Sequence, residues 1–173
     1  MKKLTKILTL LTVMVAFSAA TFAQVDATAT ATATIVTPIA IANAGDMNFG
    51  NIAVSAAGGT VILDPDGTRS ITGGVTLPST VGTVSAAHFD VTGTPSYTYT
   101  IVISGAPLTI THTTIPANTM TVVGFVSNPS GTGTLSAGGA QTIDVGATLN
   151  VGASQVGGTY VSGTPFTVTV NYN

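Results

Sequence analysis

Residues 25–41 read VDATATATATIVTPIAI, and this pattern decides how the rest of the chain is interpreted. Small apolar residues alternate strictly with hydroxyl residues, and the side chains of an extended chain alternate between two faces. One face would carry Val25, Ala27, Ala29, Ala31, Ala33 and Ile35. No turn residue precedes Pro38, so the segment has nothing adjacent to fold back on. We interpret it as a donor strand, which lacks a partner in its own domain and is given to a neighbouring copy.

The first 23 residues have the order of a secretory signal peptide. Lysines follow Met1, an apolar run occupies 7–17, and small residues end the segment at Ala23. The apolar run is too short to span a bilayer, and no second one of membrane length follows. We predict export through the inner membrane, cleavage after Ala23 and no membrane insertion. A donor-strand extension at 24–37 and one domain at 38–173 follow, because Pro38 cannot donate to a sheet ladder.

Charge is scarce in the predicted mature chain. Removing residues 1–23 from the 173 leaves 150, with Arg69 as the one Lys or Arg and six aspartates, a formal charge of −5. Such a chain cannot neutralise phosphate groups, which argues against binding to nucleic acid or anionic lipid. The absence of cysteine excludes disulfides. A nearly uncharged surface of Thr, Ser, Asn and Gly suits a protein that contacts copies of itself.

The composition of the remaining chain predicts an all-β fold. Thr and Val favour strands, and frequent Gly and Pro separate them, so we expect an antiparallel sandwich or barrel. The turn at 64–67 joins a hairpin, 131–139 is a loop, and 141–151 is two short strands or one kinked at Gly146. The expected strands are 39–44, 47–52, 60–63, 69–72, 75–77, 86–92, 97–104, 108–112, 120–126, 141–151, 160–161 and 166–173.

Few residues offer catalytic or metal chemistry. His88 and Asp90 share a strand face, but no third ligand is visible, so a solvent-facing polar pair is the simpler interpretation. His112, near a strand end among threonines, receives the same interpretation. The sequence has no nucleophile elbow. A Ser-His-Asp triad is assembled in space, so a small hydrolase stays open as a minor hypothesis.

Two further patterns also have simpler explanations. Asp64 and Asp66 match a fragment of a calcium loop, but the remaining ligands are missing, which favours a plain turn. A sugar-binding platform could be built from tyrosines, although packing is their more usual role in a small sandwich. These tyrosines are Tyr97, Tyr99, Tyr160 and Tyr172. We expect no catalytic residue, no metal and no cofactor.

Short motifs spread over the chain carry a family resemblance. They are Asn-Phe-Gly at 48–50, Gly-Gly-Val at 73–75, AHFDVTG at 87–93, VGATLNV at 145–151, Gly-Thr-Tyr at 158–160 and VTVNYN at 168–173. In this order they resemble a widespread family of small secreted bacterial domains of unassigned function. That family is related to the Mat/ECP-type common fimbrial major subunits, and the signal peptide, free N-terminal segment and penultimate Tyr172 also resemble chaperone–usher subunits.

The resemblance implies an Ig-like β-sandwich that lacks one strand and therefore has an apolar groove. A periplasmic chaperone would contact the C-terminal strand, and an outer-membrane usher would receive the subunit. The residues expected to line the groove are Phe166, Val168, Val170 and Tyr172. The donor strand of the next subunit would replace the chaperone, giving a head-to-tail fimbria that contacts host or matrix surfaces. The chain departs from classical subunits in lacking a disulfide and in having Tyr160 where they often carry Gly.

A second hypothesis is a monomeric secreted Ig-like binding module for surface glycan or matrix. Residues 27–34 would then be a flexible or glycosylated linker. This hypothesis predicts a stable monomer whose N-terminal segment is cut by proteases. It also predicts saturable sugar binding that is lost when exposed tyrosines are changed.

The Ala-Thr repeat is identical to itself after a shift of two residues, so it cannot set its own register. Val25 and Ile35 must do so, because each Ala buries little apolar area. We predict that Ile35→Asp weakens polymerisation far more than Ala29→Ser, measured as the fraction of protein that sediments as filaments. Equal effects of the two changes would contradict this assignment of the register.

Overall fold

The computed structural model describes residues 24–173, so the predicted signal peptide lies outside the described residues. No residue in this range is helical. The strands are β1 (Ala40–Gly45), β2 (Asn48–Phe49), β3 (Ala53–Leu63), β4 (Arg69–Thr76), β5 (Val84–Ser85), β6 (Ala87–Thr92), β7 (Thr98–Ser104), β8 (Leu108–His112), β9 (Thr119–Asn128), β10 (Thr132–Thr134), β11 (Ala140–Val151), β12 (Tyr160–Ser162) and β13 (Thr167–Tyr172).

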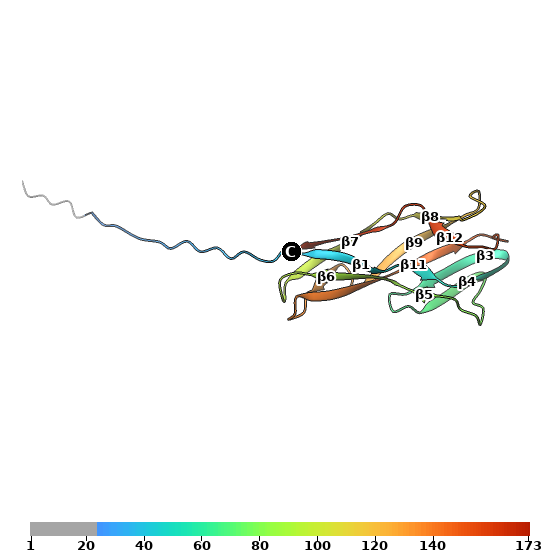
Figure 1. Cartoon of the computed structure of the whole chain (residues 1–173), viewed down its shortest axis with the longest axis horizontal. Coiled ribbons are helices and arrows are strands. Elements are labelled where there is room, and N and C mark those ends of the chain that lie inside the picture. The colour runs from blue at the N-terminus through green and yellow to red at the C-terminus, as the bar shows by residue number, and fades with distance from the viewer. Residues whose placement is uncertain (1–23) are drawn as a thin grey trace, which may run out of the picture. The chain divides into compact units, whose positions relative to one another are not determined.

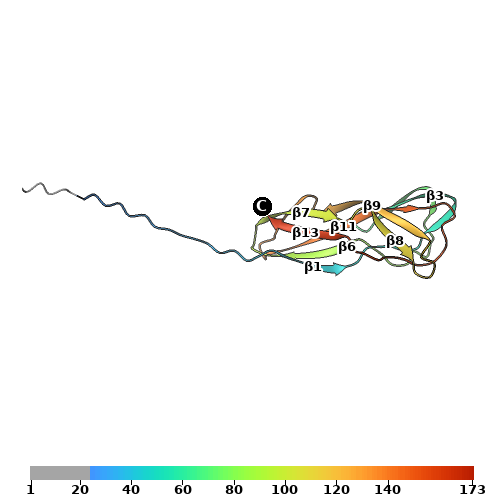
Figure 2. The ribbon, with the colours of Figure 1, turned by 90° about the horizontal axis from the view of Figure 1, so that it is seen from above.

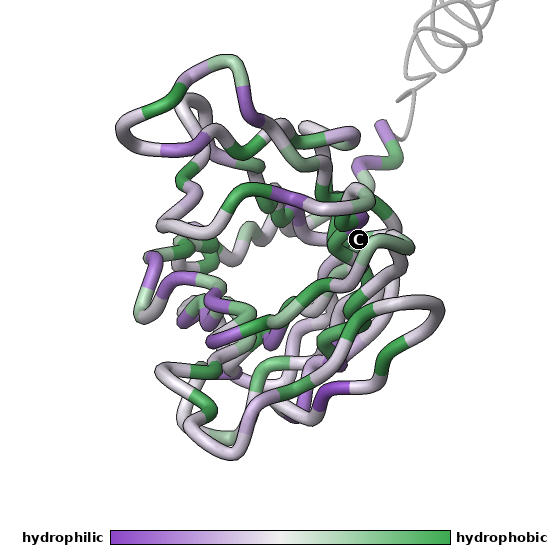
Figure 3. Tube along the Cα trace, turned by 90° about the vertical axis from the view of Figure 1, so that its right-hand side faces the viewer, coloured by the Kyte–Doolittle hydropathy of each residue, from purple (hydrophilic) through white to green (hydrophobic). Residues whose placement is uncertain are grey.

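Antiparallel ladders join these strands into a sandwich-like body at Val36–Asn173 (Figures 1 and 2). The larger sheet has the order β1-β6-β11-β9-β8-β12, and β3 and β4 extend it from β11. The smaller sheet has the order β10-β7-β13, and β2 pairs with β5. Seen end-on, the strands curl around a common interior (Figure 3). The all-β antiparallel sandwich predicted from the sequence is confirmed.

β11 connects most of the larger sheet because both of its edges are paired. One edge pairs with β6 and then with β3, and the other edge pairs with β9. The change of partner falls near Gly146, where a Cβ atom would lie 2.1 Å from the Leu63 carbonyl oxygen. The ladder with β9 shifts register between Gly146 and Thr148. Of the two alternatives for 141–151, the single irregular strand is therefore correct.

Buried side chains form two clusters in the body. The first cluster lies between β6, β11 and the smaller sheet, and Tyr99, Leu135 and Ile143 are at most 1% exposed there. Burial raises the pKa of Tyr99, whose hydroxyl donates to Gln141 Oε1 at 2.7 Å. The second cluster lies between β3, β8, β9 and β11. Phe166 packs against both clusters and so links them.

The β3–β4 hairpin is longer than the sequence indicates. A break at Gly73-Gly74 was expected, but β4 continues through both residues. A Cβ atom on Gly74 would lie 2.0 Å from the Ala57 carbonyl oxygen, so glycine permits a close backbone approach in an irregular ladder. The expected loop at 131–139 also contains β10, which pairs with β7.

The predicted donor segment forms no strand within residues 24–39. Every residue from 24 to 35 is exposed, including Val25 at 91% and Ile35 at 98%. Large apolar side chains are thus left in water, although their alternation suits a half-buried strand. The described residues contain no ladder partner for this segment.

Leu149 of β11 lies opposite Val61 of β3 and Val122 of β9, and all three are at most 2% exposed. Leu149→Ala should lower the free energy of unfolding by about 2–5 kcal/mol, because it leaves a cavity between three strands. Val102→Ala is the control, since Val102 is 54% exposed and should cost less than about 1 kcal/mol. Urea denaturation measures both, and equal losses would contradict the central role of β11.

Candidate functional site

A groove of about 870 Å³ lies over the second cluster. Its lining includes Asp46, one residue after β1, and Phe166, one residue before β13. β8, β9 and β11 supply the apolar floor, which consists of Leu108, Ile110, Met120, Val122, Leu149 and Val151. The two walls come from 46–54 and from 155–166. The groove therefore occupies the stretch of core that neither β1 nor β13 reaches.

The first wall presents apolar side chains, among them Met47, Phe49 and Ile52. Arg69 at the start of β4 holds this wall from behind. Its Nη1 donates to the Phe49 carbonyl oxygen at 2.6 Å and to the Asn51 carbonyl oxygen at 3.2 Å. The lone cation predicted for the mature chain thus positions one wall of the groove.

The second wall contains a segment that we call the strap, residues 155–162. Its strand β12 pairs with β8 in the register Tyr160 to His112, and β12 is the last strand of the larger sheet. The Tyr160 hydroxyl donates to the Val156 carbonyl oxygen at 2.7 Å and accepts from Gln155 Nε2 at 2.9 Å. The strap is therefore an ordered element with its own internal hydrogen bonds.

The structure places the four predicted groove residues of the C-terminal strand differently. Phe166 lines the groove, whereas Val168 and Val170 are 7% and 8% exposed in the first cluster. The Tyr172 hydroxyl donates to the Thr37 carbonyl oxygen at 2.9 Å and accepts from the Thr94 amide at 2.6 Å. β1 and β13 each pair with a single strand, so each leaves one backbone edge free of ladder partners in the described chain.

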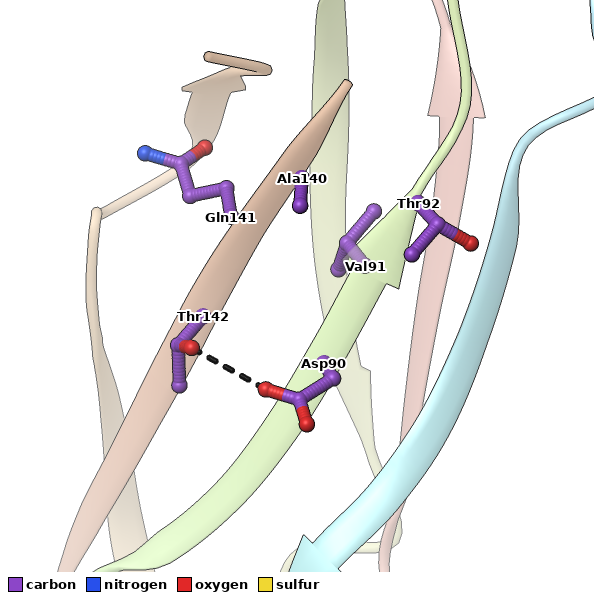
Figure 4. Close-up of a pocket in the computed structure, with 6 residues that line it drawn as sticks. All are labelled: Asp90, Val91, Thr92, Ala140, Gln141 and Thr142. Atoms are coloured by element: carbon purple, nitrogen blue, oxygen red, sulfur yellow. Dashed lines mark hydrogen bonds between the residues drawn. The ribbon is translucent and has the colours of Figure 1, made fainter. Parts of the chain in front are cut away.

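The two histidines lie apart. His88 Nδ1 lies within hydrogen-bond distance of Asp144 Oδ1 across the β6–β11 ladder, and Asp90 accepts from the Thr142 hydroxyl at 3.0 Å (Figure 4). His88 is thus part of a surface polar pair, although with Asp144 rather than Asp90. The expectation that His112 faces solvent is wrong, because it is 5% exposed.

The other candidate residues take part in a turn or in the packing of aromatic rings. Thr68 donates from its hydroxyl and its amide to Asp66 in the turn, and these bonds lower the pKa of Asp66. Tyr97 and Tyr172 pack edge to face, with centroids 5.5 Å apart. Tyr99 is buried, and Tyr160 packs against His112. Within residues 24–173, no three His, Asp or Glu side chains gather in a way that could hold a metal ion.

Comparison with known proteins assigns a family. Residues 39–172 match the domain of unknown function DUF4402, and the chain belongs to this family. No curated protein and no solved structure matches the chain. In the part of the chain that the structure describes, no helix could cross a membrane.

Sequence reasoning did not identify the groove walls. Arg69 stood out as a lone cation, but its acceptors are carbonyl groups 18 and 20 residues away, which no side-chain pattern shows. The strap could have been suspected from Gly157-Gly158, because adjacent glycines often mark a close approach of the backbone. Phe49 and Phe166 line the same groove although they lie far apart in the sequence.

Arg69→Met should loosen the first wall, since it removes the donor to two carbonyl groups while keeping an apolar stem. We expect a loss of about 1–3 kcal/mol in the free energy of unfolding, as for hydrogen bonds to charged groups. Amide exchange should rise at 49–51. Arg69→Lys retains one charged donor and should show a smaller effect, whereas unchanged exchange at 49–51 in Arg69→Met would show that Arg69 does not position this wall.

Proposed function

We propose that this chain is a structural subunit of a cell-surface filament, joined by donor-strand exchange. The apolar face of residues 25–35 of one copy occupies the groove of the next copy. The observation that carries this proposal is the presence, in the same chain, of a groove with an apolar floor and of an exposed segment with an alternating apolar face. The floor of the groove has no strand covering it, and the segment has no ladder partner among the described residues.

The chemistry of the groove suits an extended segment. The floor and the first wall present apolar side chains to one face of an incoming strand. β12 in the second wall is the terminal strand of the larger sheet, so its free edge offers backbone groups, and an added strand pairs through such groups. The hydroxyl face of the donor, Thr28 to Thr34, would then face water.

The positions of attachment and acceptance favour an open filament. Thr37, which leads into β1, lies at the Tyr172 end of β13, whereas the groove begins at Phe166 before the other end. Six residues of strand separate these ends by roughly 20 Å. A subunit that gives its segment at one end and accepts another at the opposite end makes a head-to-tail contact, which extends rather than closes.

The proposal also covers the export of the subunit, its location and its partners. The resemblance to Mat/ECP-type fimbrial subunits agrees with export, a fimbrial location and a role in adhesion. A periplasmic chaperone could protect the groove before assembly, with an outer-membrane usher guiding export. Host or matrix surfaces are the proposed targets of the completed fimbria.

Deleting residues 24–34 should abolish filaments and leave a folded monomer, because the acceptor groove stays intact without a donor. Electron microscopy and sedimentation of the concentrated protein measure this. A matched control changes Thr28, Thr30, Thr32 and Thr34 to Ser, which keeps the apolar face, and should still polymerise. Normal filaments from the deletion variant would overturn the proposal, and a monomeric unaltered protein with a protease-sensitive segment would favour the binding module.

A further inference from the structure

The strand β12 has one edge paired with β8 and one open edge. On the paired edge, the Thr113 amide donates to the Thr159 carbonyl oxygen at 2.9 Å. The backbone groups of successive residues alternate between the two edges of a strand, so Val161 also faces β8, whereas Tyr160 and Ser162 face the open edge. Within residues 24–173, no turn or loop bonds to the backbone of these two residues. An added strand would therefore find two N–H groups and two carbonyl groups there.

The open edge is held in place by contacts between β8 and the strap. His112 Nε2, at the end of β8, lies 3.1 Å from the Gly157 carbonyl oxygen. The rings of His112 and Tyr160 pack edge to face, with centroids 5.0 Å apart. A Cβ atom on Gly158 would lie 2.1 Å from His112 Nε2, so glycine permits this close approach. The edge is thus formed before any strand is added, which lowers the entropic cost of adding one.

The first wall offers side chains to the groove, because its backbone is bonded elsewhere. The carbonyl oxygens of Phe49 and Asn51 accept from Arg69 behind the wall. The Asn51 amide donates to the Val81 carbonyl oxygen at 2.8 Å. The strap, rather than this wall, therefore supplies backbone partners for an incoming strand.

The C-terminal strand β13 also has an open edge, but that edge lies outside the groove. The lining of the groove includes Phe166 and no residue of β13. Val168 and Val170 of β13 belong to the first cluster instead. A strand that covers the floor of the groove thus has β12 as its neighbour.

The ladder between β12 and β8 also decides which face of an added strand points inward. Side chains that lie opposite each other in a ladder share a face of the sheet. Tyr160 lies opposite the buried His112, and Ser162 lies opposite Ile110 of the groove floor. Val161 is on the other face and is 53% exposed. An added strand would place its apolar residues opposite Tyr160 and Ser162, and its threonines opposite Val161.

The direction of an added strand follows from the antiparallel ladders. Thr92 pairs with Ala40 at the start of β1 and with Ala140 at the start of β11, so both strands run away from the end where the donor segment is attached. The ladders from β11 to β9, β8 and β12 each reverse the direction, so β12 runs back toward that end. In a head-to-tail filament the donor is joined through residue 36 to a body beyond the opposite end. Its chain direction is then opposite to that of β12.

We propose that the groove receives residues 25–35 of a second copy by antiparallel addition to β12. The apolar residues of the donor bond through their backbone to Tyr160 and Ser162, and Ile35 lies at the mouth of the groove. The chain's own segment would reach the groove from the attachment end and run parallel to β12, so antiparallel addition distinguishes a second copy from self-insertion. This assignment rests on the proposed function, since the added strand comes from another copy.

Disulfide trapping in the full mature chain tests the edge and the direction together. Val161→Cys and Thr159→Cys place thiols on the outward face of the strap, and each is combined with one cysteine in the donor segment. The donor positions are Thr28, Thr30, Thr32, Thr34 and Val36. The donor position that couples best with Thr159→Cys should lie two residues after the one that couples best with Val161→Cys. A shift of two residues in the other direction would overturn antiparallel addition.

Two matched controls test the face and the strand. Ala31→Cys and Ala33→Cys point inward, so each should couple with Val161→Cys at least about fivefold less than the best threonine position. Thr169→Cys, exposed on β13, should couple no better than these controls. Preferred coupling through Thr169→Cys, or equal coupling of both donor faces, overturns pairing at β12 and leaves strand donation standing. No disulfide between copies from any pair overturns both.

Quenched hydrogen exchange gives a second test, which needs no cysteine. On assembly of the unaltered chain, the amides of Tyr160 and Ser162 gain acceptors, and their protection should rise at least about tenfold. The Val161 amide already faces β8 and should gain less. The monomeric reference is the full chain with Ile35→Asp. Unchanged protection of Tyr160 and Ser162 in filaments that Ile35→Asp abolishes would overturn pairing at β12 and support strand donation elsewhere in the groove.

Discussion

The double pairing of β11 is the constraint on which the rest of the body depends. With β6 and β3 on one edge and β9 on the other, the strand has no edge left for a further partner. The larger sheet must therefore grow outward, through β8 to the short β12 on one side and through β6 to β1 on the other. Because β1 ends at Gly45 and β13 begins at Thr167, the second cluster is left with an open face. The groove thus follows from the same ladders that build the core.

The segment proposed as a donor strand, residues 25–35, has the chemistry that the floor of the groove would accept. The segment has an apolar face of small side chains with larger ones at its ends, and the groove has an apolar floor between two walls. Charged side chains contribute little to this match. Arg69, the single Lys or Arg of the predicted mature chain, donates to a backbone carbonyl of the first wall. The two histidines contact Asp144 and the Gly157 carbonyl oxygen.

Much of the fold could be predicted from the sequence because strand signals are local. The alternation at 97–104 and the turn at 64–67 mark β7 and the β3–β4 hairpin directly. The course of β4 through Gly73-Gly74 could not be predicted, because glycines that break a strand and glycines that admit a close backbone look alike in a sequence. Of the residues predicted to line a strand-accepting groove, Phe166 lies in the lining of the groove over the second cluster, and Val168 and Val170 lie in the first cluster. Their predicted role in accepting a strand stays a prediction. The roles of Arg69 and His112 depend on acceptors and donors in the backbone, which carry no sequence signal.

Disulfide trapping between copies tests strand donation most directly, because the chain has no cysteine of its own. Ile35→Cys would place a thiol on the donor face, and Val156→Cys would place one in the groove wall. Mild oxidation of the double variant should give a ladder of covalent multimers that disappears on reduction. Thr34→Cys with Val156→Cys should give far less, since Thr34 points to the opposite face. Monomers alone from the Ile35→Cys and Val156→Cys pair, under conditions in which each single variant forms filaments, would contradict strand donation into this groove.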